Sequence, residues 1–213
     1  MPIYTYNNRN ILFIHIPKCG GSSFSREMSR IGMKEYLTIR GHNFTKINFL
    51  SCTPQHYDAE KLKKVLDFSN INQILILVRN PFQRLKSEYY WQLQNNIEKG
   101  SKSPAEWVEM MFREYSENNN VYDNHIRPQI DFIKGFNSAN IIKLENDGLR
   151  HAVNAVRASF EISPTQYLFK SFVSAKVHEK KSKKTKKIED EFDLIKSDIE
   201  FFYRDDYRFL GYK

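Results

Sequence analysis

Two short segments of this 213-residue chain combine side chains that bind anions. The first is PKCGGSSF, which follows an apolar run and starts at Pro17. Its paired glycines let the backbone approach a ligand closely, and the amides at the start of a following helix would point at an anion. The serine hydroxyls add donors and the lysine adds a point charge. The predicted anion-binding residues are Lys18, Cys19, Gly20, Gly21, Ser22 and Ser23.

The second segment is VRNPFQRLKSEYYW, which also follows an apolar run. Arg79 stands at the tip of that run, and Arg84 and Ser87 are three residues apart, so they share a helix face. A guanidinium and a hydroxyl that converge on one spot make a second phosphate site. Two phosphate sites in one small domain suit a ligand with two separated phosphates. The alternatives are an ordinary strand-to-helix turn for the first segment and a solvated amphipathic helix for the second.

Neither segment has the pattern of a nucleotide triphosphatase. In the first, Lys18 precedes the glycines, whereas the lysine follows them in the Walker A loop. In the second, Arg79 stands where an acidic magnesium ligand would be wanted. A nucleotide-dependent kinase of a related fold is therefore the second hypothesis rather than the first.

The elements that must position these segments alternate between strand and helix. Short apolar strands are predicted over Asn10–Ile16, Asn72–Arg79 and Asn140–Asn146. The alternation predicts an α/β fold with a parallel sheet and helices on both faces, whose ligands bind at the carboxyl ends of the strands. Both anion-binding segments follow such ends. Helices are expected over residues 22–32, 57–68, 81–97, 103–117, 148–160 and 189–203, with Ser103 and Glu106 forming a capping box.

Composition sets the remaining limits. The length predicts a single domain over residues 1–213, and 40% hydrophobic residues can build a sizeable core. The net charge of +8 suggests an anionic partner, without choosing among nucleotide, nucleic acid, lipid and acidic polysaccharide. Two cysteines without metal-ligand spacing predict reduced thiols and no metal site. Without a signal peptide or a membrane-spanning segment, the expected compartment is the cytoplasm, or a lumen if an anchor was removed.

The two segments together resemble the sulfotransferases that use 3′-phosphoadenosine 5′-phosphosulfate (PAPS). The resemblance implies a P-loop-like sulfotransferase fold in three layers and an enzyme that needs no metal and releases adenosine 3′,5′-bisphosphate (PAP). It places the 5′-phosphosulfate on the loop from Lys18 to Ser23, with Lys18 at the leaving oxygen, and the 3′-phosphate on Arg79 and Ser87. Arg84 matches the motif as a support. The sequence IPKCGG resembles that of the carbohydrate branch, which includes heparan sulfate 2-O-sulfotransferases. This resemblance implies a saccharide acceptor.

Sulfuryl transfer also needs a base, and a histidine is a natural one. His42, in RGHNF, is the first candidate, because a Gly-His segment in this region carries the base in the 2-O-sulfotransferase-like enzymes. His125 and His56 are the next two, and together with Arg127 they are predicted to contact the acceptor. His15 is expected to be a packed core residue. For each histidine a structural role is the alternative.

The lysine-rich run from Lys180 to Lys187 occupies the place of a basic loop that closes over the nucleotide in the family. By this resemblance Lys183 and Lys184 are predicted to bind the nucleotide, and the alternative is a solvated basic loop. Two further hypotheses remain: a polyanion-binding or nucleic-acid-binding module without catalysis, and an inactive relative that keeps the nucleotide site but lacks a base. The leading hypothesis expects no nucleic-acid partner.

Overall fold

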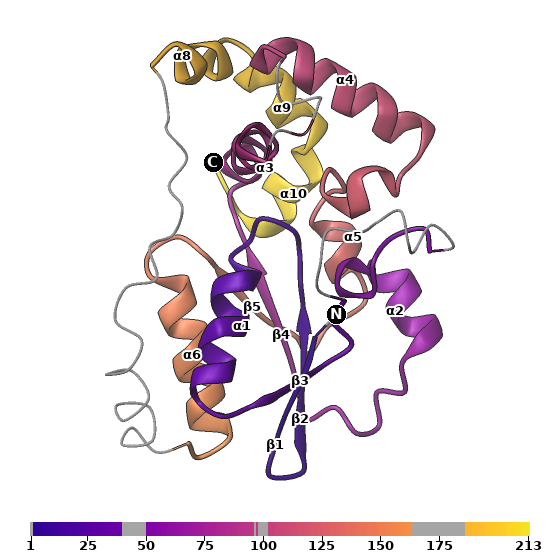
Figure 1. Cartoon of the computed structure of the whole chain (residues 1–213), viewed down its shortest axis with the longest axis vertical. Coiled ribbons are helices and arrows are strands. Elements are labelled where there is room, and N and C mark those ends of the chain that lie inside the picture. The colour runs from indigo at the N-terminus through magenta and orange to yellow at the C-terminus, as the bar shows by residue number, and fades with distance from the viewer. Residues whose placement is uncertain (1, 40–49, 96, 98–101, 163–185) are drawn as a thin grey trace.

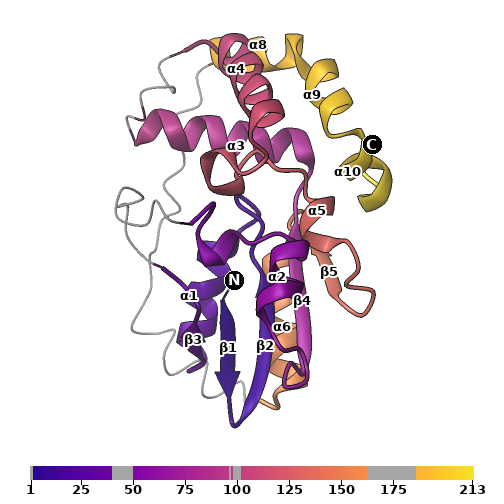
Figure 2. The same cartoon turned by 90° about the vertical axis from the view of Figure 1, so that its right-hand side faces the viewer.

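A computed structural model describes residues 2–39, 50–95, 97, 102–162 and 186–213 of the chain. Its centre is a five-stranded sheet with the strand order β3-β1-β2-β4-β5 (Figures 1 and 2). Strands β2, β4 and β5 run parallel, with β5 at one edge of the sheet. The buried parts of β2 and β4 are built from apolar residues, as a sheet covered on both faces requires. The strands are β1 (Ile3–Tyr6), β2 (Arg9–Ile14), β3 (Lys34–Tyr36), β4 (Gln73–Val78) and β5 (Asn140–Lys143).

The expected parallel core is confirmed, but the whole sheet is mixed. β1 pairs antiparallel with β2 and with β3, and neither β1 nor β3 was predicted. β1 and β2 form a hairpin around Asn7 and Asn8, whose φ angles of 47° and 59° suit a tight hairpin turn. The N-terminal segment therefore adds a strand between β2 and the edge strand β3.

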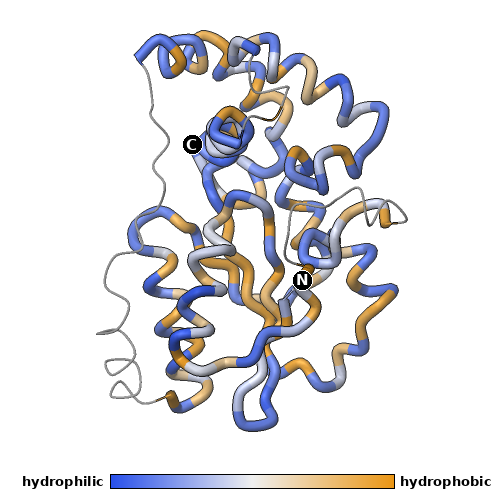
Figure 3. Tube along the Cα trace, in the orientation of Figure 1, coloured by the Kyte–Doolittle hydropathy of each residue, from blue (hydrophilic) through white to orange (hydrophobic). Residues whose placement is uncertain are grey.

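Helices cover both faces of the sheet, as predicted (Figure 1). α1 and α6 pack together on one face, and α2 and α5 pack together on the other. Apolar residues concentrate along the central strands (Figure 3), where Ile11, Leu12, Leu75 and Ile76 are fully buried. The bounds are α1 (Gly21–Arg30), α2 (Ala59–Val65), α5 (Ile130–Ile133) and α6 (Gly148–Ser159).

A further layer of helices lies over the carboxyl ends of the parallel strands (Figures 1 and 2). It has its own aromatic core, in which Trp107, Phe192 and Tyr203 are buried. The predicted single helix over residues 189–203 is wrong, because the C-terminal segment forms three short helices. The predicted capping box at Ser103 is confirmed. The layer contains α3 (Pro81–Gln94), α4 (Pro104–Glu117), α8 (Lys186–Leu194), α9 (Lys196–Phe202) and α10 (Arg204–Leu210), and the 3₁₀ turns are η2 (Pro54–His56) and η4 (Val121–Asn124).

Within the described residues, no helix has both the length and the apolar character that a bilayer crossing requires.

Candidate functional site

The turn after β2 leads directly into α1. Lys18 and Gly20 both have left-handed backbones, with φ angles of 65° and 83°. Gly20 is the N-cap of α1, and no side chain caps the helix. The amide of Cys19 bonds to the carbonyl of Ile16 at 3.3 Å, but no hydrogen bond within the described residues uses the amides of Gly21, Ser22 and Ser23. These amides and the helix dipole can therefore receive an anion.

Lys18 brings a positive charge to this turn. Its ammonium lies 5.1 Å from the centre of the Trp91 ring, and no ion pair or hydrogen bond joins it to another described residue. Burial lowers the pKa of Lys18 and outweighs the charge of Glu88, which raises it. An anion at the turn would complete the environment of this cation.

The second strand end approaches the first. Arg79 directly follows β4, as predicted, and its Nη1 donates to the carbonyl of Lys18 at 3.3 Å. Asn80 caps α3 by accepting from the amide of Gln83, and Pro81 occupies the first turn. The hydroxyl of Ser87, half-buried on α3, makes no hydrogen bond with the described residues.

Arg84 has a different environment from Ser87. Its side chain is buried, and its Nη2 donates to the carbonyl of Arg127 at 2.5 Å. Its guanidinium also lies 5.5 Å from the Tyr203 ring. Arg84 therefore connects α3 to the segment at Arg127 and to the C-terminal helices at Tyr203, which fits the supporting role that the motif implies.

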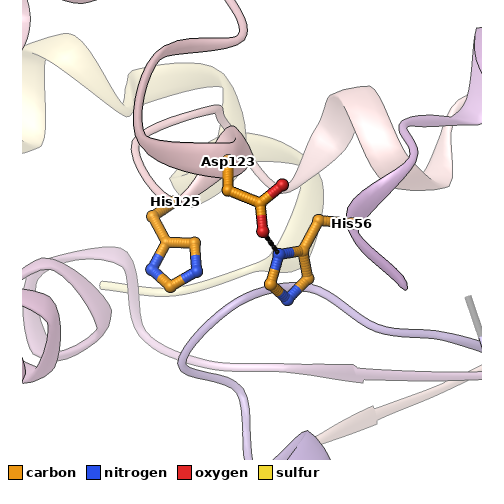
Figure 4. Close-up of side chains that lie close together, drawn as sticks. All are labelled: His56, Asp123 and His125. Atoms are coloured by element: carbon orange, nitrogen blue, oxygen red, sulfur yellow. Dashed lines mark hydrogen bonds and ion pairs between the residues drawn. The ribbon is translucent and has the colours of Figure 1, made fainter. Parts of the chain in front are cut away.

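Two histidine–carboxylate pairs lie next to each other near the same edge of the sheet. His125 Nδ1 lies 2.7 Å from Glu88 Oε2. His56 Nδ1 lies 2.5 Å from Asp123 Oδ2, and the dashed line in Figure 4 marks this pair. The two imidazole rings are 5.0 Å apart, and the His125 ring is 5.7 Å from Trp91. Since Lys18 contacts Trp91 as well, the lysine and His125 border the same indole.

The carboxylates decide which ring nitrogen of each histidine is free. Burial alone would raise the pKa of Glu88, but the charge and the hydrogen bond of His125, and the charge of Lys18, lower it to about 2. An ionised carboxylate can only accept, so Nδ1 of His125 donates, and Nε2 is the ring nitrogen that remains for proton exchange. The same argument leaves Nε2 of His56 free, because Asp123 is held ionised by His56 and Thr53.

An unusual backbone segment carries Asp123 and precedes His125. Tyr122, Asp123 and Asn124 have φ angles of 51°, 54° and 64°. Residues other than glycine rarely adopt this left-handed backbone conformation in succession. Asp123 accepts from the amide and hydroxyl of Thr53, and Asn124 donates to the carbonyl of His56 at 2.8 Å. These bonds hold the strained segment against η2 and so fix the position of His125.

Comparison with known proteins gives one match. The profile of the Sulfotransferase family matches residues 2–213, nearly the whole chain. The chain belongs to the sulfotransferase family. No curated protein and no solved structure matches it. Family membership makes the chain a PAPS-dependent sulfotransferase, an enzyme that transfers a sulfuryl group from this donor.

The sulfotransferase site contains groups that fit a donor with phosphate at both ends. Lys18 and the open amides of α1 form one cationic end, and Arg79 and Ser87 follow the neighbouring strand. Cys19 differs from the other loop residues, because its buried side chain points away from solvent and its thiol donates to Gln129 Oε1 at 3.3 Å.

Several predicted residues of the sulfotransferase are placed differently. Arg127 is paired with Asp58 at 3.3 Å and with Asp131 at 3.5 Å, so its charge is engaged within the protein. The predicted base His42 and the predicted nucleotide-binding Lys183 and Lys184 lie outside the described residues.

Sequence reasoning missed the partners of the histidines. Glu88, Asp123 and Trp91 were not singled out, although a glutamate on the buried side of a helix is an available signal, since carboxylates are seldom buried unpaired. His15 was expected in the core, and its ring does lie among buried groups, 5.0 Å from His56. It contacts the sulfotransferase loop directly.

Replacement of Gly21 by alanine is expected to destabilise the enzyme by about 1 to 3 kcal/mol and to weaken nucleotide binding. A Cβ at this position would lie 2.1, 2.3 and 2.6 Å from Nε2, Cδ2 and Cε1 of His15, so ring or loop must move. Urea unfolding and calorimetric titration with PAP measure the two effects. Ser29→Ala, at an exposed position of the same helix, is the control; equal behaviour of the two variants would contradict the prediction.

The stability of the sulfotransferase is expected to fall as the pH drops below about 6.5. Burial, followed by the charge of His56, holds the pKa of His15 well below the usual value of a histidine, and burial also lowers the pKa of His56. The unfolded chain then binds more protons than the folded one, so stability is complete above the unfolded pKa and is lost on acidification, by at most about 1.4 kcal/mol per pH unit for each histidine. Urea midpoints across this range measure the slope. His15→Gln should flatten it, and a midpoint that rises on acidification would refute the assignment.

Proposed function

We propose that this sulfotransferase transfers the sulfuryl group of PAPS to a hydroxyl of a carbohydrate, with His125 as the general base. The observation that carries the base is the pairing of His125 with buried Glu88 beside the indole that Lys18 contacts. This pairing orients the ring and leaves Nε2 free for a proton. A base and a cation near one point are what the reaction requires.

The proposed step is an in-line displacement at sulfur. The acceptor oxygen forms a bond to sulfur while the bond from sulfur to the 5′-phosphate oxygen breaks. Nε2 of His125 takes the hydroxyl proton, and the electron pair of the broken bond remains on the phosphate of PAP. Lys18 and the free amides of Gly21 to Ser23 stabilise this developing charge, because they are fixed before the reaction starts.

The proposed arrangement of the donor follows the two strand ends. The 5′ end lies on the loop from Lys18 to Ser23, and the 3′-phosphate lies on Arg79 and Ser87. The bond from Arg79 to the carbonyl of Lys18 supports this arrangement, since it keeps the two strand ends together. Lys183 and Lys184 remain proposed nucleotide ligands on the strength of the family resemblance alone.

The acceptor side is proposed to include His56, whose Nε2 is the free nitrogen of the second pair. Arg127 contributes by holding the backbone that follows His125, through its ion pair with Asp58. His42 is the alternative base. A carbohydrate acceptor is supported by the IPKCGG sequence of the loop. An acidic polysaccharide also suits the net charge of +8.

One experiment tests the function directly. The full chain is incubated with sulfate-labelled PAPS, without added metal, and with a panel of acidic glycans, neutral glycans and small alcohols. Label is expected on a glycan hydroxyl, with one PAP formed per sulfate transferred. Label confined to small alcohols would contradict the carbohydrate acceptor, and hydrolysis of PAPS without any sulfated acceptor would contradict the proposed transfer.

A further inference from the structure

A buried glutamine connects both nucleotide-binding turns. Gln129 is fully buried, and its side chain pairs with both backbone groups of Arg79: Oε1 accepts from the amide at 2.9 Å and Nε2 donates to the carbonyl at 2.7 Å. A neighbouring strand would offer the same pair of bonds. The glutamine therefore continues the pairing of β4 by one residue beyond its last strand position, at the point where the anion-binding guanidinium starts.

The same side chain holds the other turn. Oε1 of Gln129 also accepts from the thiol of Cys19 at 3.3 Å. Burial raises the pKa of this thiol to about 12, so it stays protonated and can donate. One amide oxygen thus joins the turn after β2 to the turn after β4, and this gives the cysteine in the loop a role that needs no thiol reactivity.

A carboxylate from the C-terminal helices fixes the glutamine in turn. Asp206 on α10 is fully buried, and its two oxygens accept from the amides of Gln129 and Ile130 at 2.8 and 2.9 Å. Gln129 follows His125 by one turn of backbone, and the hydroxyl of Tyr203 donates to the carbonyl between them, that of Ile126, at 2.7 Å. The segment that carries the proposed base is therefore anchored to the same helical layer.

We infer that Gln129 is a positioning residue, which holds the Cys19 turn and the Arg79 strand end at the spacing that the two phosphates of the nucleotide require. It touches neither phosphate itself. Its loss leaves the amide and carbonyl of Arg79 without their buried partner, so both turns can shift relative to each other. The effect should appear in nucleotide affinity, because the two turns then no longer hold both phosphates at the same time.

This inference rests on the proposed function for the identity of the ligand, so the probe is PAP. Gln129→Met keeps the length of the side chain and removes all its hydrogen bonds. It is expected to weaken PAP binding about tenfold in calorimetric titration, since the three buried hydrogen bonds of the side chain are lost. Ile199→Ala is the control, because it removes buried volume from α9 without contacting either turn.

Two comparisons decide the outcome. The positioning role is supported if both variants lower the melting temperature equally and only Gln129→Met weakens PAP binding. An equal loss of PAP affinity in both variants would mean that Gln129 contributes only to general stability. Unchanged PAP affinity in Gln129→Met would overturn the inference. If the unaltered protein itself does not bind PAP, the assigned nucleotide is wrong rather than the role of the glutamine alone.

The thiol gives a second, milder variant pair if Gln129→Met does not fold. Cys19→Ala removes the donor at nearly constant size, whereas Cys19→Ser keeps one. We expect Cys19→Ala to weaken PAP binding about threefold and Cys19→Ser to restore it, because a thiol donor is weak but the hydroxyl donor is not. Equal affinity of the two variants for PAP would overturn the part of the inference that concerns Cys19.

Discussion

Replacement of Lys18 by methionine is expected to lower kcat about a thousandfold, because the variant loses the fixed charge that is proposed to stabilise the leaving oxygen. The ammonium of Lys18 has no anionic partner among the described residues and lies against Trp91, so it is available to the phosphate as the bond from sulfur breaks. Methionine fills similar volume, which keeps the contact with the indole. Initial rates at saturating PAPS measure the effect.

Lys64→Met is the control for Lys18→Met. Lys64 is exposed on α2 and pairs with Glu60 one turn away, so its loss should leave kcat within about twofold. Retention of more than a tenth of kcat in Lys18→Met would contradict the role of this lysine at the leaving group.

Replacement of His125 by alanine is expected to lower kcat about a thousandfold and to leave PAP affinity unchanged, since a general base acts on the acceptor proton and not on the donor. Glu88→Gln should lower kcat by a smaller factor of about tenfold, because the amide no longer fixes the ring nitrogen that donates. Single-turnover rates with saturating PAPS, together with calorimetric titration of PAP, separate the two effects.

The variant His42→Ala makes this test selective. If His125 is the base, His42→Ala should keep kcat within about tenfold, and added imidazole should partly restore His125→Ala alone. A thousandfold loss in His42→Ala together with near-normal turnover in His125→Ala would transfer the role to His42, the residue that the family pattern favoured.

The sequence predicted the parts of the fold that depend on local pattern. The apolar runs before the glycine turn and before Arg79 predicted β2, β4 and the two turns that follow them. This succeeded because strand and turn propensities act over a few residues. β1 was missed since its polar and aromatic residues, with the Asn7–Asn8 turn, form a strand only by pairing with β2. The helical layer over the strand ends depends on packing between segments far apart in the chain.

The nucleotide turns and the base differ in how far sequence can predict them. Lys18 and Arg79 belong to contiguous motifs, each explained by its own strand end. The carboxylates that pair with the histidines are distant in the sequence. Asp123 is 67 residues from His56, and Glu88 is 37 residues from His125. The choice among six histidines therefore depended on which carboxylates the fold would bring to them, which residue spacing does not encode.

The buried bond between Cys19 and Gln129 also has a chemical consequence for how the protein can be handled. Alkylating reagents attack the thiolate, and burial keeps Cys19 protonated and out of their reach. Modification of Cys19 must then wait for the loop to open, so its labelling rate reports how often the turn separates from the strand end. A bound nucleotide would slow that labelling. The labelling rate of Cys19 therefore measures how often the donor site opens.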